Sequence, residues 1–109
     1  MAGRFKSRLP LLRRWREIAN KVTEAVKRLY PQAEVYLIGG IAENRATINS
    51  DVDIAIVFKE PLDRSRRIGI LTHIWEFIES EVPMYYPLEI HILEAKEFGR
   101  IRGRKVKLS

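Results

Sequence analysis

The stretch VYLIGGIAENRATINSDVDIAIVF, residues 35–58, decides the fold of this chain. It starts as an apolar run that ends at Gly39 and Gly40, continues through a polar loop, and ends in a second apolar run that carries Asp51 and Asp53. Because side chains alternate between the two faces of a strand, both aspartates are expected on one face and their apolar neighbours on the other. Two carboxylates side by side repel each other unless a cation lies between them. The pattern therefore predicts half of a metal site.

The chain is short and contains no cysteine. Its 109 residues, 46% of them hydrophobic, suffice for a single domain with one modest core, residues 1–109. The absence of cysteine excludes disulfides, cysteine nucleophiles and thiolate zinc sites. No apolar run is long enough to cross a membrane, and nothing suggests secretion, so we expect a cytoplasmic protein without membrane contact. The basic start resembles a transit peptide, but its apolar spacing continues into the first expected helix, which favours retention.

The net charge of +6 is unevenly distributed. Residues 1–16 carry six Lys or Arg and no acid, and residues 99–109 carry five and no acid. We therefore expect a basic N-terminal extension (1–10) and a basic C-terminal extension (99–109). These ends attract either RNA phosphates or an acidic partner surface, or they are solvated tails. The C-terminal segment has no interleaved aromatic residues that would stack single-stranded bases.

Two segments show the periodicity of amphipathic helices. The first runs from Leu11 to Tyr30 and stops before Pro31. On its apolar stripe, Trp15 is assigned to the core rather than to base stacking. The second runs from Ile68 to Val82, with a buried stripe expected at Ile68, Leu71, Ile74 or Trp75, Ile78 and Val82. His73 lies off this stripe and is expected to be exposed.

Two further segments are expected to be strands: Ala33 to Ile38, which is rich in β formers, and Leu88 to Leu93, where apolar residues alternate with Glu89 and His91. A glutamate in such a strand needs a partner, and a neighbouring strand that carries Asp53 would provide one. The alternative is an edge strand whose polar face, Glu89 and His91, lies in water. With the glycines and aspartates upstream, we favour Glu89 as a metal ligand or base.

Gly39 and Gly40 allow a tight turn and a close approach of the backbone to a ligand. In the loop that follows, residues 42–44 are expected to form a short helical turn, with Asn44 in the left-handed region. Backbone N–H groups at such a turn suit an anion such as a triphosphate. A glycine pair alone is weak evidence, and its value comes from its distance to Asp51.

Gly39 and Gly40, ten intervening residues, and Asp51 and Asp53 ahead of an apolar strand resemble the signature of the polymerase-β-type nucleotidyltransferase superfamily. The run GGIAENRATINSDVDIAIV is similar to the form of this signature in minimal nucleotidyltransferases. With the expected helices and strands, the resemblance covers roughly residues 10–95. It implies an α/β (α+β) fold, in which two main helices pack on one face of a small mixed sheet of three to four strands. The acidic site would be open on the other face.

The resemblance also implies a catalytic site. Asp51 and Asp53 would hold one or two Mg²⁺ ions, and Glu89, as the third carboxylate, would bind the second ion and help to deprotonate the attacking hydroxyl. Gly39 and Gly40 would clasp the phosphates of ATP or another nucleoside triphosphate.

This chain departs from the family pattern around the glycines. Gly40 stands where most relatives have serine, so phosphate contacts would fall to backbone N–H groups. Glu43 stands where many relatives have Arg or Lys, and Arg45 is the expected substitute for that cation. Ser50 either caps the turn or contacts a phosphate.

Three functional hypotheses follow. The first is a Mg²⁺-dependent nucleotidyltransferase that moves a nucleoside monophosphate, AMP from ATP, onto a hydroxyl. By the resemblance, the acceptor is a tyrosine of a small helical partner of the HEPN type, for which this chain acts as antitoxin. The second is a weak or inactive binding module that neutralises a helical partner by contact, as the departures at Gly40 and Glu43 suggest. The third is an RNA-binding protein that uses its basic ends.

Overall fold

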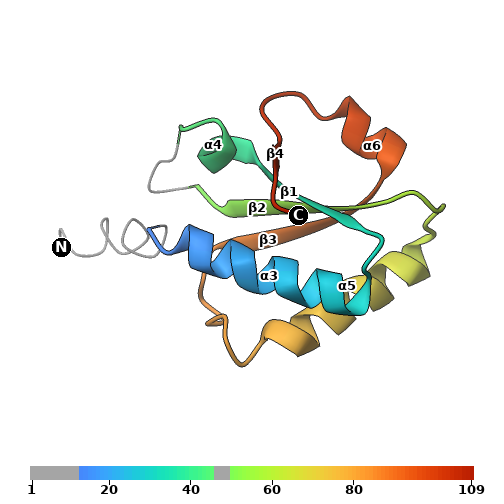
Figure 1. The fold of residues 1–109 in the computed structure, drawn as a ribbon, viewed down its shortest axis with the longest axis horizontal. Helices are drawn as coiled ribbons and strands as arrows, with labels where there is room; N and C mark the ends of the chain where they lie inside the picture. The colour runs from blue at the N-terminus through green and yellow to red at the C-terminus, as the bar shows by residue number, and fades with distance from the viewer. Residues whose placement is uncertain (1–12, 46–49) are drawn as a thin grey trace.

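The computed structural model describes residues 13–45 and 50–109, and four strands form one mixed sheet (Figure 1). The strand order is β3-β2-β1-β4. The elements, in chain order, are α3 (Trp15–Leu29), β1 (Glu34–Ile38), α4 (Gly39–Ala42), β2 (Val52–Phe58), α5 (Arg64–Ile78), β3 (Leu88–Glu94), α6 (Ala95–Arg100) and β4 (Val106–Lys107). The expected mixed sheet is confirmed.

Strand β2 lies between one antiparallel and one parallel neighbour. β1 pairs with it antiparallel, and β3 pairs with it parallel after the crossover through α5. A parallel pair needs such a crossover because both strands must start at the same end of the sheet. In this register Asp53 lies opposite Glu89 on one side and opposite Ile38 on the other. The topology therefore brings the ends of three strands to one place.

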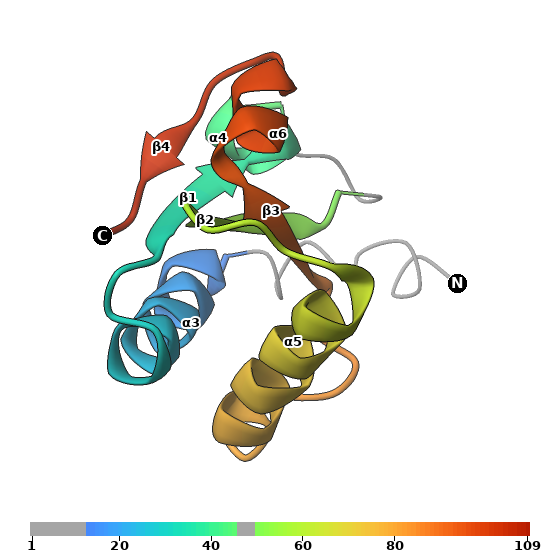
Figure 2. The same ribbon diagram turned by 90° about the vertical axis from the view of Figure 1, so that its right-hand side faces the viewer.

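Helices α3 and α5 cover one face of the sheet, as expected (Figure 2). Every second residue of β2 points into this layer and is buried, as the alternation of a strand requires. Full burial of one aliphatic side chain stabilises the fold by about 1.5–3 kcal/mol, so this layer is the main core. Its fully buried large side chains are Ile18, Val22, Val26, Val35, Leu37, Val52, Ile54, Ile56, Ile70, Ile74 and Val82.

Helix α3 confirms the periodicity of the first segment. The helix ends at Leu29, before Pro31, and its apolar stripe, which includes Ile18, Val22 and Val26, faces the core. Trp15 packs against the core, with the Arg16 guanidinium 4.7 Å from its ring centre, so its assignment to the core is confirmed. Leu11 and Leu12 lie outside the described residues.

Helix α5 differs from its prediction by about one turn at each end. It begins at Arg64 because the side chain of Asp63 accepts a hydrogen bond from the Arg66 backbone N–H (2.7 Å) and caps the first turn. It ends at Ile78, four residues before the predicted end at Val82. The predicted stripe is wrong at Ile68, which is 55% exposed. The buried helical positions are instead Ile70, Ile74 and Ile78, each four residues apart.

The opposite face of the sheet is partly covered, which the sequence did not predict. Helix α6 lies there (Figure 2), and Phe98 and Ile101 pack against a second small cluster of Ile38, Ala55 and Val57. The rings of Tyr36 and Phe98 have centroids 4.4 Å apart. After α6 the chain returns to the sheet, and β4 pairs antiparallel with β1. The C-terminal segment thus contributes both a helix and an edge strand.

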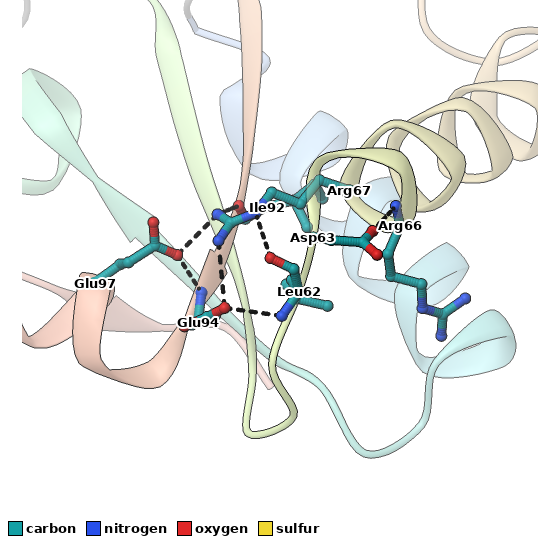
Figure 3. Close-up of polar contacts among 7 residues, drawn as sticks. All are labelled: Leu62, Asp63, Arg66, Arg67, Ile92, Glu94 and Glu97. Atoms are coloured by element: carbon teal, nitrogen blue, oxygen red, sulfur yellow. Dashed lines mark hydrogen bonds and ion pairs between the residues drawn. The ribbon is translucent and has the colours of Figure 1, made fainter.

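A network around Arg67 ties the crossover to β3 and α6 (Figure 3). The guanidinium donates to the backbone carbonyl of Ile92 (3.1 Å) and to the carboxylate of Glu97 (2.8 Å). Its second terminal nitrogen lies 3.5 Å from Glu94 Oε2, which also accepts the Leu62 backbone N–H (2.8 Å). This Arg67 network closes the end of the sheet at which β3 stops.

None of the helices in the described ranges is both long and apolar enough to span a membrane.

Candidate active site

Three polar side chains meet on the sheet face opposite α3 and α5, near the points where β2 and β3 begin. Asp53 and Glu89 are register partners in the parallel pair, and His91 lies two residues further along β3. One possible ligand atom from each residue lies within 4.8 Å of the others. His91 Nε2 is 3.3 Å from Asp53 Oδ1 and 3.6 Å from Glu89 Oε1. The strand register thus assembles two carboxylates and one imidazole.

This site is accessible and carries concentrated negative charge. The side chains of Asp53, Glu89 and His91 are 24%, 56% and 32% exposed. Among the residues that the structure describes, no Lys or Arg forms an ion pair with Asp53 or Glu89. Facing carboxylates without a fixed cation favour the binding of a divalent cation, which relieves their repulsion.

Asp51 lies just outside the strand in which it was expected. β2 begins at Val52, so Asp51 occupies the preceding loop position, where it is half-buried. The group of ligand atoms formed by Asp53, Glu89 and His91 does not include it. The shared cation between Asp51 and Asp53 stays a prediction.

Gly39 directly adjoins the carboxylate of Asp53. Its φ angle is +77°, and a Cβ atom built at this position would lie 2.5 Å from Asp53 Oδ2. Only glycine fits here without displacing the carboxylate, because any larger side chain would be strained by both the backbone angle and the contact. The turn expected at residues 42–44 begins earlier, as α4 at Gly39. Asn44 has φ 59°, so its left-handed conformation is confirmed.

The other loop residues fall into two groups. A Cβ atom built at Gly40 would lie 3.4 Å from Ser50 Oγ, an ordinary contact, so these two predicted phosphate-contacting residues are neighbours. Arg45 instead pairs with Glu43, with Nη2 3.1 Å from Oε1. Arg45 was expected to supply the cation that many relatives carry at position 43. In this arrangement its charge is instead balanced by Glu43 itself.

His91 is the residue that the sequence reasoning missed as part of the site. Its spacing from Glu89 already placed both side chains on one face of the strand. The sequence reasoning used that pattern only for the alternative of a solvated edge. β3 is indeed an edge strand, but its polar face meets Asp53 of β2.

Residues 19–108 match the family model described as a nucleotidyltransferase domain. A Methanocaldococcus jannaschii protein, named as a candidate protein adenylyltransferase, is 28% identical over 76 residues, which are 70% of this chain and 78% of that protein. The crystal structure of a candidate nucleotidyltransferase is 30% identical, with a TM-score of 0.65 over 83% of this chain and 96% of that chain. A toxin–antitoxin crystal structure with AMP-PNP is 16% identical, with a TM-score of 0.51 over 84% and 72% of the respective chains, and shares the fold.

The matched range contains the glycine pair, both aspartates and Glu89, together with all four strands. The resemblance on which the sequence interpretation rests is therefore confirmed, as is the prediction of a nucleotidyltransferase enzyme. Because the family model covers the acidic site and most of the chain, this protein belongs to the nucleotidyltransferase-domain family.

Proposed function

We propose that this protein transfers AMP from ATP onto an acceptor hydroxyl, with a divalent cation held by Asp51, Asp53 and Glu89. The observation that carries this proposal is the register of β2 and β3, which sets Asp53 opposite Glu89 on an accessible face. The family match supports the reaction class.

The carboxylates of the site fit a divalent cation such as Mg²⁺, because carboxylate oxygens are the protein ligands that this ion prefers. Asp53 and Glu89 provide such oxygens, and no described Lys or Arg forms an ion pair with either of them. One or two bound ions would neutralise triphosphate charge and favour in-line attack of the acceptor oxygen at the α-phosphorus, with pyrophosphate as the leaving group. Asp53 and Glu89 thus serve as ligands that the fold positions in advance.

The residues around the carboxylates have separate roles. The backbone of Gly39 lies directly against the Asp53 carboxylate, and the N–H groups of Gly39 and Gly40 are the proposed phosphate contacts beside it. Ser50 lies beside Gly40 and is proposed as a further phosphate contact. Glu89 accepts the proton of the acceptor hydroxyl.

Arg45 joins the phosphate contacts by exchanging its partner. Its present ion pair with Glu43 is exposed, since 66% of the Arg45 side chain is accessible. Exposed pairs of this kind contribute about 0–1 kcal/mol, so a triphosphate with several negative charges competes for the guanidinium.

The acceptor is a tyrosine of a small helical partner of the HEPN type, and this protein acts in the cytoplasm as its antitoxin. The open position of Glu89 supports a protein acceptor, because a side chain of another molecule can reach it. The adenylyltransferase-named relative supports transfer to protein, and the shared fold with a toxin–antitoxin structure supports the partner class.

The test is label transfer from α-labelled ATP with Mg²⁺, in a lysate that contains the product of the neighbouring gene. Asp53→Asn should reduce transfer by at least about a thousandfold, because a metal ligand of the reaction is lost. Asp63→Asn is the matched control: it removes the same charge at the cap of α5, and asparagine is an equally good cap. Full transfer by folded Asp53→Asn would contradict the proposal.

The Glu43–Arg45 pair favours a second candidate, a contact antitoxin without transferase activity, because it leaves the phosphate site without an unpaired arginine at position 45. An Asp51→Asn, Asp53→Asn double variant separates the two. Neutralisation of the partner by this variant supports contact inhibition, whereas loss of neutralisation supports the transferase.

RNA contact through the basic ends is a further proposal. Within the C-terminal segment, Lys105 donates to the Phe98 carbonyl and Lys107 lies 3.5 Å from Glu34, whereas Arg102 and Arg104 are exposed. Replacing both arginines with glutamine should lower RNA affinity and reduce the salt-dependence slope by about two. Unchanged RNA binding would remove this proposal.

A further inference from the structure

His91 is positioned by the strand register rather than by chance proximity. It follows Glu89 by two residues on β3, so both side chains leave the same face of the sheet. Its register partner on β2 is Ala55, a small and fully buried residue. From this position the imidazole extends toward Asp53.

The imidazole nitrogen that faces the carboxylates has the spacing of a metal ligand. Nε2 lies 3.3 Å from Asp53 Oδ1 and 3.6 Å from Glu89 Oε1. Adjacent ligands around an octahedral ion with bonds of about 2.1 Å lie about 3.0 Å apart. Nε2 therefore lies about 0.3 Å beyond this spacing from the Asp53 oxygen and about 0.6 Å beyond it from the Glu89 oxygen, and one ligand atom of each residue lies within 4.8 Å of the others.

We propose that His91 is a further protein ligand of the cation, through Nε2, and that the site consequently prefers Mn²⁺ to Mg²⁺. This inference rests on the proposed function, since it concerns the cation that Asp53 and Glu89 hold. Mg²⁺ selects oxygen ligands and retains its water, whereas transition ions accept imidazole nitrogen readily. A set of two carboxylates and one imidazole therefore discriminates between the two ions.

The other role open to His91 is a hydrogen bond that only orients Asp53. In that case the nitrogen never touches the cation, and replacing His91 would change the affinities for Mn²⁺ and Mg²⁺ in parallel. If His91 is a ligand, its replacement should weaken the binding of Mn²⁺ but not that of Mg²⁺. The unmodified protein should then show a direct magnetic coupling between Mn²⁺ and the imidazole nitrogen. The two roles thus differ in what a spectroscopic measurement detects.

The experiment measures Mn²⁺ binding to the full chain by electron paramagnetic resonance and searches for ¹⁴N modulation in the electron spin-echo signal. The unmodified protein should bind Mn²⁺ more tightly than Mg²⁺ and show the ¹⁴N coupling. His91→Gln should lose the coupling and weaken Mn²⁺ binding by about tenfold or more, while Mg²⁺ affinity changes by less than about twofold.

The chain supplies its own control, because its only other histidine is His73. His73 is exposed on α5, as predicted, with Nδ1 3.1 Å from the Tyr30 hydroxyl, and α5 lies on the opposite face of the sheet from the site. His73→Gln should retain both the coupling and the Mn²⁺ affinity.

Failure of this inference and failure of the proposed function give different results. In one outcome, Mn²⁺ binds without nitrogen coupling, its affinity is unchanged in His91→Gln, and binding is lost in Asp53→Asn. This outcome overturns the role of His91 and retains the acidic site. Mn²⁺ binding that survives Asp53→Asn, or no binding to the unmodified protein, overturns both. The ¹⁴N measurement on the unmodified protein decides the ligand without relying on the folding of any variant.

Discussion

The two ends of β3 each carry a glutamate, but the surroundings of these glutamates are opposite in charge. Near the end of the strand, Glu94 accepts the Leu62 backbone N–H at 2.8 Å and lies 3.5 Å from the guanidinium of Arg67. Near its start, Glu89 lies opposite Asp53 and 3.6 Å from the imidazole of His91. One end is thus closed by a permanent cation, and the other concentrates negative charge.

The difference separates a structural carboxylate, Glu94, from Glu89, the carboxylate on the same strand that we propose binds the cation. Glu94 joins the crossover to the sheet, and its negative charge is already matched in the Arg67 network. Glu89 adds charge to Asp53, which costs stability in the absence of a cation and provides affinity in its presence. A carboxylate that faces another carboxylate is therefore a better indication of a functional site than a carboxylate that is paired with an arginine.

For this comparison between the two ends of β3, the largest expected effect comes from replacing each of the two glutamates with glutamine. Glu89→Gln should reduce nucleotidyl transfer at least about a hundredfold, because a proposed metal ligand and proton acceptor is lost. Its unfolding free energy should be unchanged or higher, since the repulsion with Asp53 is relieved. Glu94→Gln should do the reverse, retaining transfer while the unfolding free energy falls by about 1–2 kcal/mol.

Urea unfolding and label transfer, measured on both variants, test this crossed pattern. Equal loss of stability in the two variants would show that Glu89 also supports the fold. Equal loss of transfer would show that the Arg67 network influences the site from the far end of β3.

A smaller effect is expected at the glycine pair. Gly39→Ala should lower the unfolding free energy by about 1–2 kcal/mol and impair transfer, because it combines a left-handed backbone with a Cβ that displaces the Asp53 carboxylate. Gly40→Ala is the adjacent control, since its Cβ makes only ordinary contacts. Its stability should stay within about 0.5 kcal/mol of the unmodified protein. Stability is measured by thermal unfolding. Equal decreases in the melting temperatures of Gly39→Ala and Gly40→Ala would contradict this account of Gly39.

The smallest effect is a pH dependence at the closed end. The pKa of Glu97 is lowered below its usual 4.5, first by the backbone N–H of Glu94 and then by the Arg67 side chain. The stabilisation from its ionised form is therefore present above pH 4.5 and is lost as pH falls below that value toward the folded-state pKa.

Urea midpoints measured across this range should consequently fall less steeply for Glu97→Gln than for the unmodified protein. Glu76→Gln, on the exposed surface of α5, should follow the unmodified protein. Parallel acid curves for Glu97→Gln and the unmodified protein would show that the interactions of Glu97 contribute nothing to acid stability.

The sequence predicted the layer of α3 and α5 and the proximity of Asp53 and Glu89, because both follow from local periodicity. Strand alternation fixes which face Asp53 and Glu89 occupy, and one parallel pairing then brings them together. The same alternation placed His91 on that face, but its role depends on the distance from Nε2 to Asp53, which periodicity does not contain.

The remaining differences come from one local side-chain cap and from contacts between segments that are distant in the sequence. The start of α5 depends on a side chain-to-backbone cap at Asp63 within a stretch whose composition resembles a loop. Helix α6 and strand β4 are short, and they are held by Phe98 against Tyr36 and by the pairing with β1. Such short elements depend on tertiary packing, which local propensity does not predict.

The crossover between β2 and β3 also determines when, during synthesis of the chain, the proposed acidic site can form. Asp53 and Glu89 lie on opposite sides of α5 in the sequence, so a nascent chain that ends within this helix carries only half of the site. The carboxylates meet only when α5 has docked and β3 has entered the sheet in register. The proposed cation binding would therefore be a property of the completed fold, and an unfinished chain would lack the proposed site for nucleotide transfer.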